Sequence, residues 1–170
     1  GAVFDGNGLA TALFNIGDDR GIAHIIGTVN ELSDTIQIVI ESTNASHIQI
    51  IPPDQDEIMV QGGGGIEYSE VWVHITDDYG NLVYDEEYKV HFQISEPAPV
   101  GISLGQDGNL EVTKNSDFGT TSITIVSGSA PGSVHLTVKL FNINDDVTLD
   151  TPIAIAESIP LTVVTGPPEY

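Results

Sequence analysis

The sequence contains no cysteine, and this absence excludes several kinds of chemistry at once. Without thiols the chain can form no disulfide, no zinc–thiolate site and no thiol nucleophile. Basic residues are also scarce: 4 Lys and Arg stand against 25 Asp and Glu, and the formal net charge is −21. Such a charge repels phosphate backbones and anionic membrane surfaces, so we expect no nucleic-acid partner.

Long hydrophobic runs are missing too. No apolar stretch approaches the roughly 20 residues that a membrane-spanning helix needs, so we expect no membrane insertion in this fragment. The chain begins at Gly1 without the basic and apolar regions of a signal peptide, and we interpret it as a piece of a longer protein. Apolar residues nevertheless make up 40% of the chain, which is enough for a packed core.

Apolar and polar residues alternate with a period of two, and no run of ten residues shows helical periodicity. The segments 71–76 and 88–94 put Val, Ile, Phe and Tyr on one face and mostly polar side chains on the other. This pattern is typical of half-buried strands in antiparallel sheets. Turns rich in Gly, Asp and Asn separate the runs. We also expect a first strand over 46–52, continued over 56–61 after the Pro52-Pro53 break.

Two segments of the chain resemble one another at a separation of 111 residues, from Gly8 to Gly119. The offset superimposes three glycines and one histidine: Gly8 on Gly119, Gly17 on Gly128, Gly21 on Gly132, and His24 on His135. Each copy is predicted as a strand, a glycine-flanked turn and a second strand, followed by a further strand. A period of this length corresponds to one sandwich domain rather than to a short solenoid repeat.

The repeat predicts two domains of unequal completeness. Residues 1–42 are interpreted as the C-terminal part of an incomplete Ig-like domain, 43–166 as a complete sandwich, and 167–170 as a tail. The inward residues of the first part are Phe14, Ile25, Ile36 and Ile38. Three strands cannot close a sandwich, and open strand edges invite pairing. We therefore expect residues 1–41 to be covered by another copy in a strand-complemented or swapped homodimer, or to pack on their own complete domain.

Three motifs resemble the bacterial Ig-like domains of the invasin and intimin type. They are Ile75-Thr-Asp-Asp-Tyr-Gly-Asn-Leu-Val83, Val90-His-Phe92, and the glycine-spaced segment from Gly119 to Val134, which Gly8 to Ala23 matches again. Leu82 stands in place of the family's usual proline, and the insertion 141–157 departs from compact members. The resemblance implies an all-β fold, an antiparallel Ig-like β-sandwich repeated along the chain.

The same resemblance implies a non-catalytic function. Such modules act as stalk or spacer repeats in adhesion proteins at the bacterial cell surface or in secreted proteins, and their partners are neighbouring Ig-like repeats. The family has no catalytic residues to transfer, so we expect no enzyme. Two alternatives stay open: a ligand-binding module, either carbohydrate-binding or a calcium-dependent adhesin repeat, and an accessory domain of an extracellular hydrolase.

Acidic residues in loops are candidates for calcium, which takes six to eight oxygen ligands, usually from loops. One candidate group is Asp54, Asp56 and Glu57; the other is Asp77, Asp78 and Asn81. Bound calcium at a domain junction would stiffen a tandem array. No other cofactor is expected.

Two aromatic residues are candidates for ligand binding, because alternation places Trp72 on the solvent side of its strand and Tyr68 at the strand's start. Aromatic rings there could stack on sugars. The alternative is that Trp72 packs under the insertion 141–157 or against the neighbouring partial domain, since large apolar surfaces are rarely left exposed. Most of the 5 histidines fall on solvent-facing positions, and His74 and His91 become neighbours if their strands pair.

Overall fold

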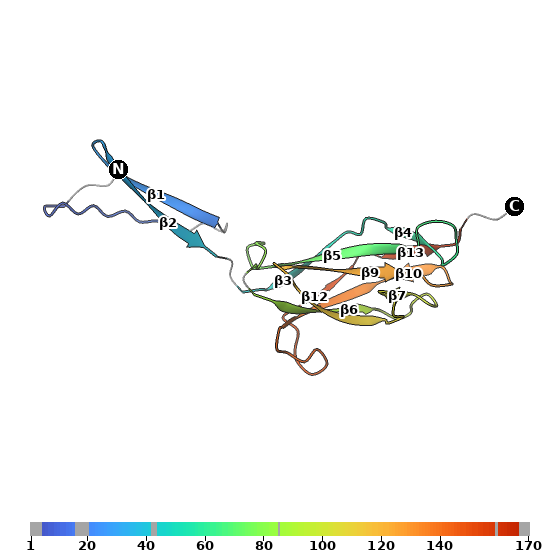
Figure 1. Ribbon diagram of the computed structural model, residues 1–170. Coiled ribbons are helices and arrows are strands. Elements are labelled where there is room, and N and C mark those ends of the chain that lie inside the picture. The colour runs from blue at the N-terminus through green and yellow to red at the C-terminus, as the bar shows by residue number, and fades with distance from the viewer. Residues whose placement is uncertain (1–4, 16–20, 42–43, 85, 159, 167–170) are drawn as a thin grey trace. The chain divides into compact units, whose positions relative to one another are not determined.

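The computed structural model describes residues 5–15, 21–41, 44–84, 86–158 and 160–166, and it divides the chain into two compact units, Gly1–Glu41 and Ser42–Tyr170 (Figure 1). Strands and turns make up both units, and the described residues contain no helix. Over the same residues the structure has no helix that is long and apolar enough to cross a membrane. The predicted tail, 167–170, and Gly17 of the repeat lie outside the described residues.

The first unit is built on one hairpin. Strand β1 (Gly21–Val29) pairs antiparallel with β2 (Leu32–Ile40), in a register that runs from Gly21↔Ile40 to Val29↔Leu32. The two strands are joined by a two-residue turn in which Asn30 has a φ of 54°, a conformation that Asn tolerates well. The first strand that the repeat predicts for this copy is not formed: Ala10 makes a single β-bridge, and residues 11–15 have no regular structure. In the second unit the corresponding strand is held between two partners, and the described part of the first unit offers none.

The second unit contains three sheets. One sheet has the order β3 (His47–Ile51), β5 (Tyr68–Thr76), β9 (Thr120–Val126), β7 (Ser103–Leu104). A second has the order β12 (Ala154–Glu157), β11 (Leu136–Asn142), β6 (Tyr88–Ile94), β8 (Glu111–Asn115). The third has the order β10 (Gly132–Val134), β13 (Leu161–Val164), β4 (Glu57–Met59). The predicted all-β sandwich is confirmed.

The core of this unit lies between the sheets, where the alternating apolar residues meet. Its largest fully buried side chains include Phe92, Ile75, Leu104, Ile125, Leu136 and Leu140. Each such side chain contributes roughly 1.5–3 kcal/mol through removal from water. Alternation therefore assigned the inward faces of β5 and β6 correctly.

The segment after β3 changes sheet. Pro52 and Pro53 have no N–H groups, so the ladder with β5 cannot continue through them. Beyond them β4 pairs in parallel with β13, and the Thr162 N–H donates to the Asp56 carbonyl at 2.9 Å. The expected continuation of β3 thus forms as a strand but joins a different sheet.

The insertion between β11 and β12 folds onto the outer face of the second sheet and forms the loop that projects from the sandwich in Figure 1. The Lys89 ammonium, on β6, donates to the Asp145 carbonyl at 2.7 Å. Inside the loop, the Asp146 carboxylate accepts hydrogen bonds from the hydroxyl of Thr148 at 2.7 Å and from its N–H at 2.9 Å. These two hydrogen bonds lower the pKa of Asp146. Phe141 points to this outer side by alternation yet is 0% exposed, and we attribute its burial to the insertion.

Tyr88 fastens the start of the second unit to β6. Its hydroxyl donates to the Glu86 carboxylate at 2.8 Å and accepts from the Ala45 N–H at 3.3 Å. The ring is buried, and burial, followed by the hydrogen bond to Glu86, raises the pKa of Tyr88. The Tyr88 hydroxyl therefore links the residues just before β3 to β6.

Candidate functional site

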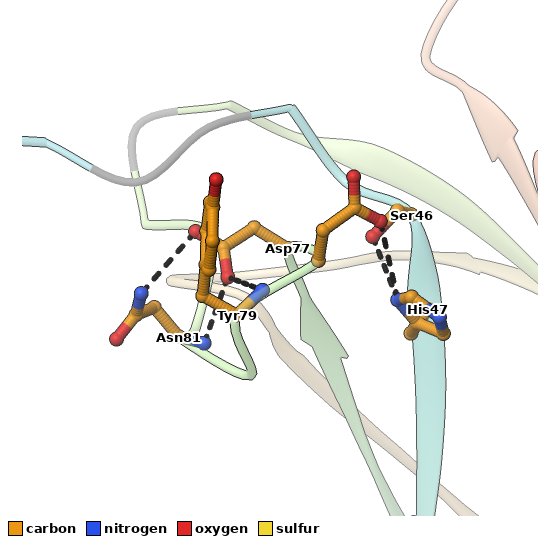
Figure 2. Close-up of polar contacts among 6 residues, drawn as sticks. Ser46, His47, Asp77, Tyr79 and Asn81 are labelled. Atoms are coloured by element: carbon orange, nitrogen blue, oxygen red, sulfur yellow. Dashed lines mark hydrogen bonds and ion pairs between the residues drawn. The ribbon is translucent and has the colours of Figure 1, made fainter. Parts of the chain in front are cut away.

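The turn at 77–81 is closed by its own carboxylate (Figure 2). Asp77 Oδ1 accepts from the N–H groups of Tyr79 at 3.0 Å and Asn81 at 2.9 Å, while the Asn81 amide reaches Asp77 Oδ2 at 3.4 Å. Gly80 provides the positive φ, 85°, that the turn requires. Asp77 is 1% exposed. Because its buried carboxylate accepts these hydrogen bonds, it stabilises the turn that carries the Asp-Asp-Tyr-Gly-Asn motif.

The two predicted calcium groups lie at opposite ends of β3. Asp77 follows Thr76, which pairs with His47 at the start of β3, whereas Asp54 lies three residues after Ile51, the last residue of that strand. Asp54 and Asp56 line a hollow of about 320 Å³ together with three prolines. Among the described residues, no group of three or more His, Asp or Glu side chains is arranged to hold a metal ion. Calcium binding therefore stays a prediction.

A serine, a histidine and an aspartate meet at the start of the second unit (Figure 2). Ser46 Oγ lies 2.7 Å from His47 Nδ1, and Asp78 Oδ1 lies 3.8 Å from the same nitrogen. In a catalytic triad the acid holds the ring nitrogen opposite the one that activates the hydroxyl. Here both groups approach Nδ1, and the His47 and Asp78 side chains are 63% and 73% exposed, so this cluster lacks triad geometry.

Trp72 and Tyr68 lie on the outer face of β5 and are 44% and 61% exposed. Trp72 sits in register between Ile51 of β3 and Ser122 of β9. The idea that the insertion 141–157 covers Trp72 is wrong, because that segment lies on the other sheet. A ligand-binding role for the two aromatic residues stays a prediction.

The condition that would make His74 and His91 neighbours, pairing of their strands, is not met. His74 lies on β5 and His91 on β6, and these strands belong to different sheets. His91 is only 9% exposed, although alternation placed it on a solvent-facing side. Alternation identifies the face of a sheet but not the loop that folds over it.

His91 lies in a pocket of about 480 Å³ between the second sheet and the insertion. Its Nδ1 lies 3.0 Å from Thr113 Oγ1 on β8, and its Nε2 lies 3.8 Å from the Glu111 carboxylate on the same strand. Lys139 is the register partner of His91 on β11, and its Nζ lies 3.4 Å from Gln93 Oε1. The pocket therefore collects an imidazole, an ammonium, an amide, a hydroxyl and a carboxylate.

The environment of this pocket shifts the titration of His91. Burial lowers the pKa of His91, the Glu111 carboxylate opposes that shift, and the Lys139 ammonium adds to it. The sequence placed His91 and Lys139 on solvent-facing sides of their strands but gave no sign that they are register partners. The sequence contains one indication of this site, the long polar insertion after residue 141. A segment of this length between two strands has to lie over the outer face of one of the sheets.

Comparison with known proteins adds evidence on the fold. No family model and no curated protein matches this chain. Among solved structures, FdeC, an Escherichia coli adhesin, is similar with a TM-score of 0.51 and 16% identity over 89% of this chain and 42% of its own. The Yersinia pseudotuberculosis adhesin InvE gives 0.50 and 13% over 96% of this chain and 45% of its own. A glycosyl hydrolase family 2 member from Bacteroides cellulosilyticus gives 0.50 and 17% over 85% of this chain and 17% of its own.

The chain thus spans less than half the length of each of these proteins. At these identities the likeness shows the fold: an all-β sandwich of the kind found in adhesin Ig-like domains, consistent with the bacterial Ig-like resemblance. The neighbours that the chain covers to the greater extent are adhesins rather than the hydrolase.

Proposed function

We propose that this chain is a non-catalytic structural and adhesion module, a stalk or spacer segment of a bacterial cell-surface or secreted protein. The observation that supports this most directly is the hairpin of the first unit. Gly21 of β1 pairs with Ile40 of the strand that follows it, and Gly132, the counterpart of Gly21 at the 111-residue offset, pairs with Val163 of the last strand. Two copies of one terminal strand pairing in one chain favour a tandem array of Ig-like repeats, whose partners are its neighbours.

The first unit also presents an apolar face that needs a partner. Ile25 and Ile36 are register partners and therefore share one face of the hairpin. Ile36 is 57% exposed, whereas Leu136, which the offset pairs with Ile25, is 1% exposed in the complete unit. Exposed apolar β-structure with free edges pairs readily with another chain. We therefore propose that a second copy covers residues 1–41 and gives a strand-complemented homodimer.

Light scattering combined with limited proteolysis tests this proposal. We expect a mass of twice the 18.0 kDa of one chain, and residues 1–41 protected from protease in the dimer. Ile36→Lys, which places a charge on the covered face, should give the monomer with rapid cleavage of 1–41. Ser33→Lys is the matched control, because Ser33 lies on the opposite face of β2 and its register partner is the polar Thr28.

Two results would contradict the dimer. One is a monomeric mass of the parent chain at every concentration together with rapid loss of residues 1–41. The other is an equal effect of the lysine substitutions at 33 and 36, which would show that charge alone, rather than the apolar face, governs association.

The glycosyl hydrolase likeness supports a second candidate, an accessory domain of an extracellular hydrolase. The complete sequence of the protein that carries this segment separates the two: further Ig-like repeats favour the stalk, and a catalytic domain favours the accessory role. Either way, the segment itself is proposed to be non-catalytic.

A further inference from the structure

Among the described residues, the ammonium of Lys139 in the pocket under the insertion forms no ion pair with a carboxylate. The chain carries 25 Asp and Glu, yet none of the described lysines forms an ion pair with a carboxylate. Lys139 is half-buried in this pocket beside His91, and the contact it makes is a long one of 3.4 Å to the Gln93 amide oxygen. A half-buried ammonium in so acidic a protein, held next to an imidazole, is well placed to bind an anion.

The rest of the pocket is suited to hydroxyl groups. Glu111 provides hydrogen-bond acceptors, Gln93 both donors and acceptors, and the hydroxyls of Thr113 and Thr148 can act as either. Val147 of the insertion adds apolar surface, on which the C–H face of a sugar ring could rest. The volume of about 480 Å³ lies in the range of small-molecule sites.

The charge of the whole molecule narrows the class of anion. A net charge of −21 repels polyanions, so the ligand that fits is one with a single negative group and several hydroxyls. We propose that the pocket between β6, β8, β11 and the insertion binds a sugar that carries one carboxylate, with Lys139 and His91 facing the carboxylate and Gln93, Thr113 and Glu111 facing the hydroxyls. This site is independent of the proposed stalk function, and it lies on the sheet opposite Trp72.

Titration of the ¹⁵N-labelled chain with D-glucuronate tests the proposal, with D-glucose and acetate as the comparison ligands. We expect saturable amide shifts confined to 91–93, 111–113, 137–139 and 147–148. Glucose lacks the charge-assisted contact and acetate lacks the hydroxyl contacts, so each should bind more weakly than glucuronate, by about tenfold or more.

Lys139→Gln should weaken glucuronate binding by about tenfold or more. Lys114→Gln is the matched control: it removes the same charge from a lysine whose Nζ donates to the Ser122 carbonyl on the other sheet, so affinity should be unchanged. If Lys139→Gln does not fold, Thr148→Val in the exposed loop takes its place, with a smaller expected loss. Absence of shifts in the pocket of the parent chain, equal affinity for glucose, or equal effects of the two lysine substitutions would overturn the proposal.

Discussion

The two segments related by the 111-residue offset have nearly the same φ angles at two matched glycines but different surroundings. Gly8 and Gly119 have φ angles of 81° and 71°, and Gly21 and Gly132 have φ angles of 150° and 156°. Local sequence is thus sufficient to set these turns, since the glycines adopt the same conformations whether or not a domain is built around them.

Surroundings separate the two copies. A Cβ atom at Gly119 would lie 2.7 Å from the Val83 carbonyl oxygen, and one at Gly132 would lie 3.1 Å from the Pro99 ring. At Gly8 the same atom would meet nothing within 4 Å. The conformation of these glycines therefore follows from the segment itself, whereas the first strand, its burial and most of the stability depend on partner strands that the first unit does not have among its described residues.

The largest difference is expected from the offset pair Leu136 and Ile25. Leu136→Ala should lower the free energy of unfolding of the second unit by about 2–5 kcal/mol, because Leu136 is fully buried. Ile25→Ala should leave that unit unchanged, since Ile25 belongs to the first. Trp72, the one tryptophan of the chain, reports the unfolding of the second unit by fluorescence in a denaturant titration. A midpoint that moves equally in both variants would show that the two units unfold together.

The second pair is Gly119→Ala against Gly8→Ala. Both substitutions put a side chain at positive φ, which costs roughly 1–2 kcal/mol per residue. Only at Gly119 does the new methyl group also meet a backbone oxygen, that of Val83. Gly119→Ala should therefore lower the melting temperature of the second unit by several degrees, and Gly8→Ala should leave it in place. Equal melting temperatures in the two variants would show that the backbone at Val83 moves aside without cost.

These contrasts indicate which features the sequence could predict. The inward faces of β5 and β6 follow from alternation alone, because one buried side of a pleated strand imposes a period of two. The turn at 77–81 follows from its Asp, Gly and Asn. The position of β4 does not, because pairing with β13 joins residues about a hundred positions apart that carry no local signal.

The candidate sites were predictable to a smaller extent. The sequence predicts Asp77 as a calcium ligand, and the structure shows that its carboxylate accepts hydrogen bonds from its own turn; the Asp-Asp-Tyr-Gly-Asn motif alone does not distinguish these two roles. The pocket around His91 depends on Lys139 and Glu111, which come from two further strands. Only the pairing of β11, β6 and β8 brings these residues together, and the sequence does not contain that register in readable form.

A smaller effect is expected in the turn that precedes β9. Phe118 has a φ of 47° and is 66% exposed, and the offset pairs it with Asn7. Asn tolerates positive φ far better than an aromatic residue does. Phe118→Asn should raise the free energy of unfolding by up to about 1 kcal/mol, less the loss of the ring contact with Tyr84, whose centroid lies 6.4 Å away. Phe118→Ala is the control, because it removes the ring but keeps the strain. Equal stability of the two variants would mean that strain is not the cause.

The smallest effect is expected at His91, in the second unit, where the long insertion stands in place of the tight turn of the first. Facing His91 are Glu111 from β8, Lys139 from β11 and the loop that carries Asp146. Because burial lowers the pKa of His91 in the folded chain, the unfolded state binds the proton more readily.

The free energy of unfolding should therefore decrease as the pH falls below about 6.5, the ordinary value for histidine, and this loss should level off once the pH is below the folded pKa. His91→Gln cannot bind the proton, so its stability should change less over the same window. Denaturant titrations of parent and variant, followed by Trp72 fluorescence between neutral and mildly acidic pH, measure the difference. A variant with the parent's full pH dependence would show that His91 does not titrate differently in the two states. A steeper dependence would show that the Glu111 carboxylate stabilises the charged imidazole more than burial destabilises it.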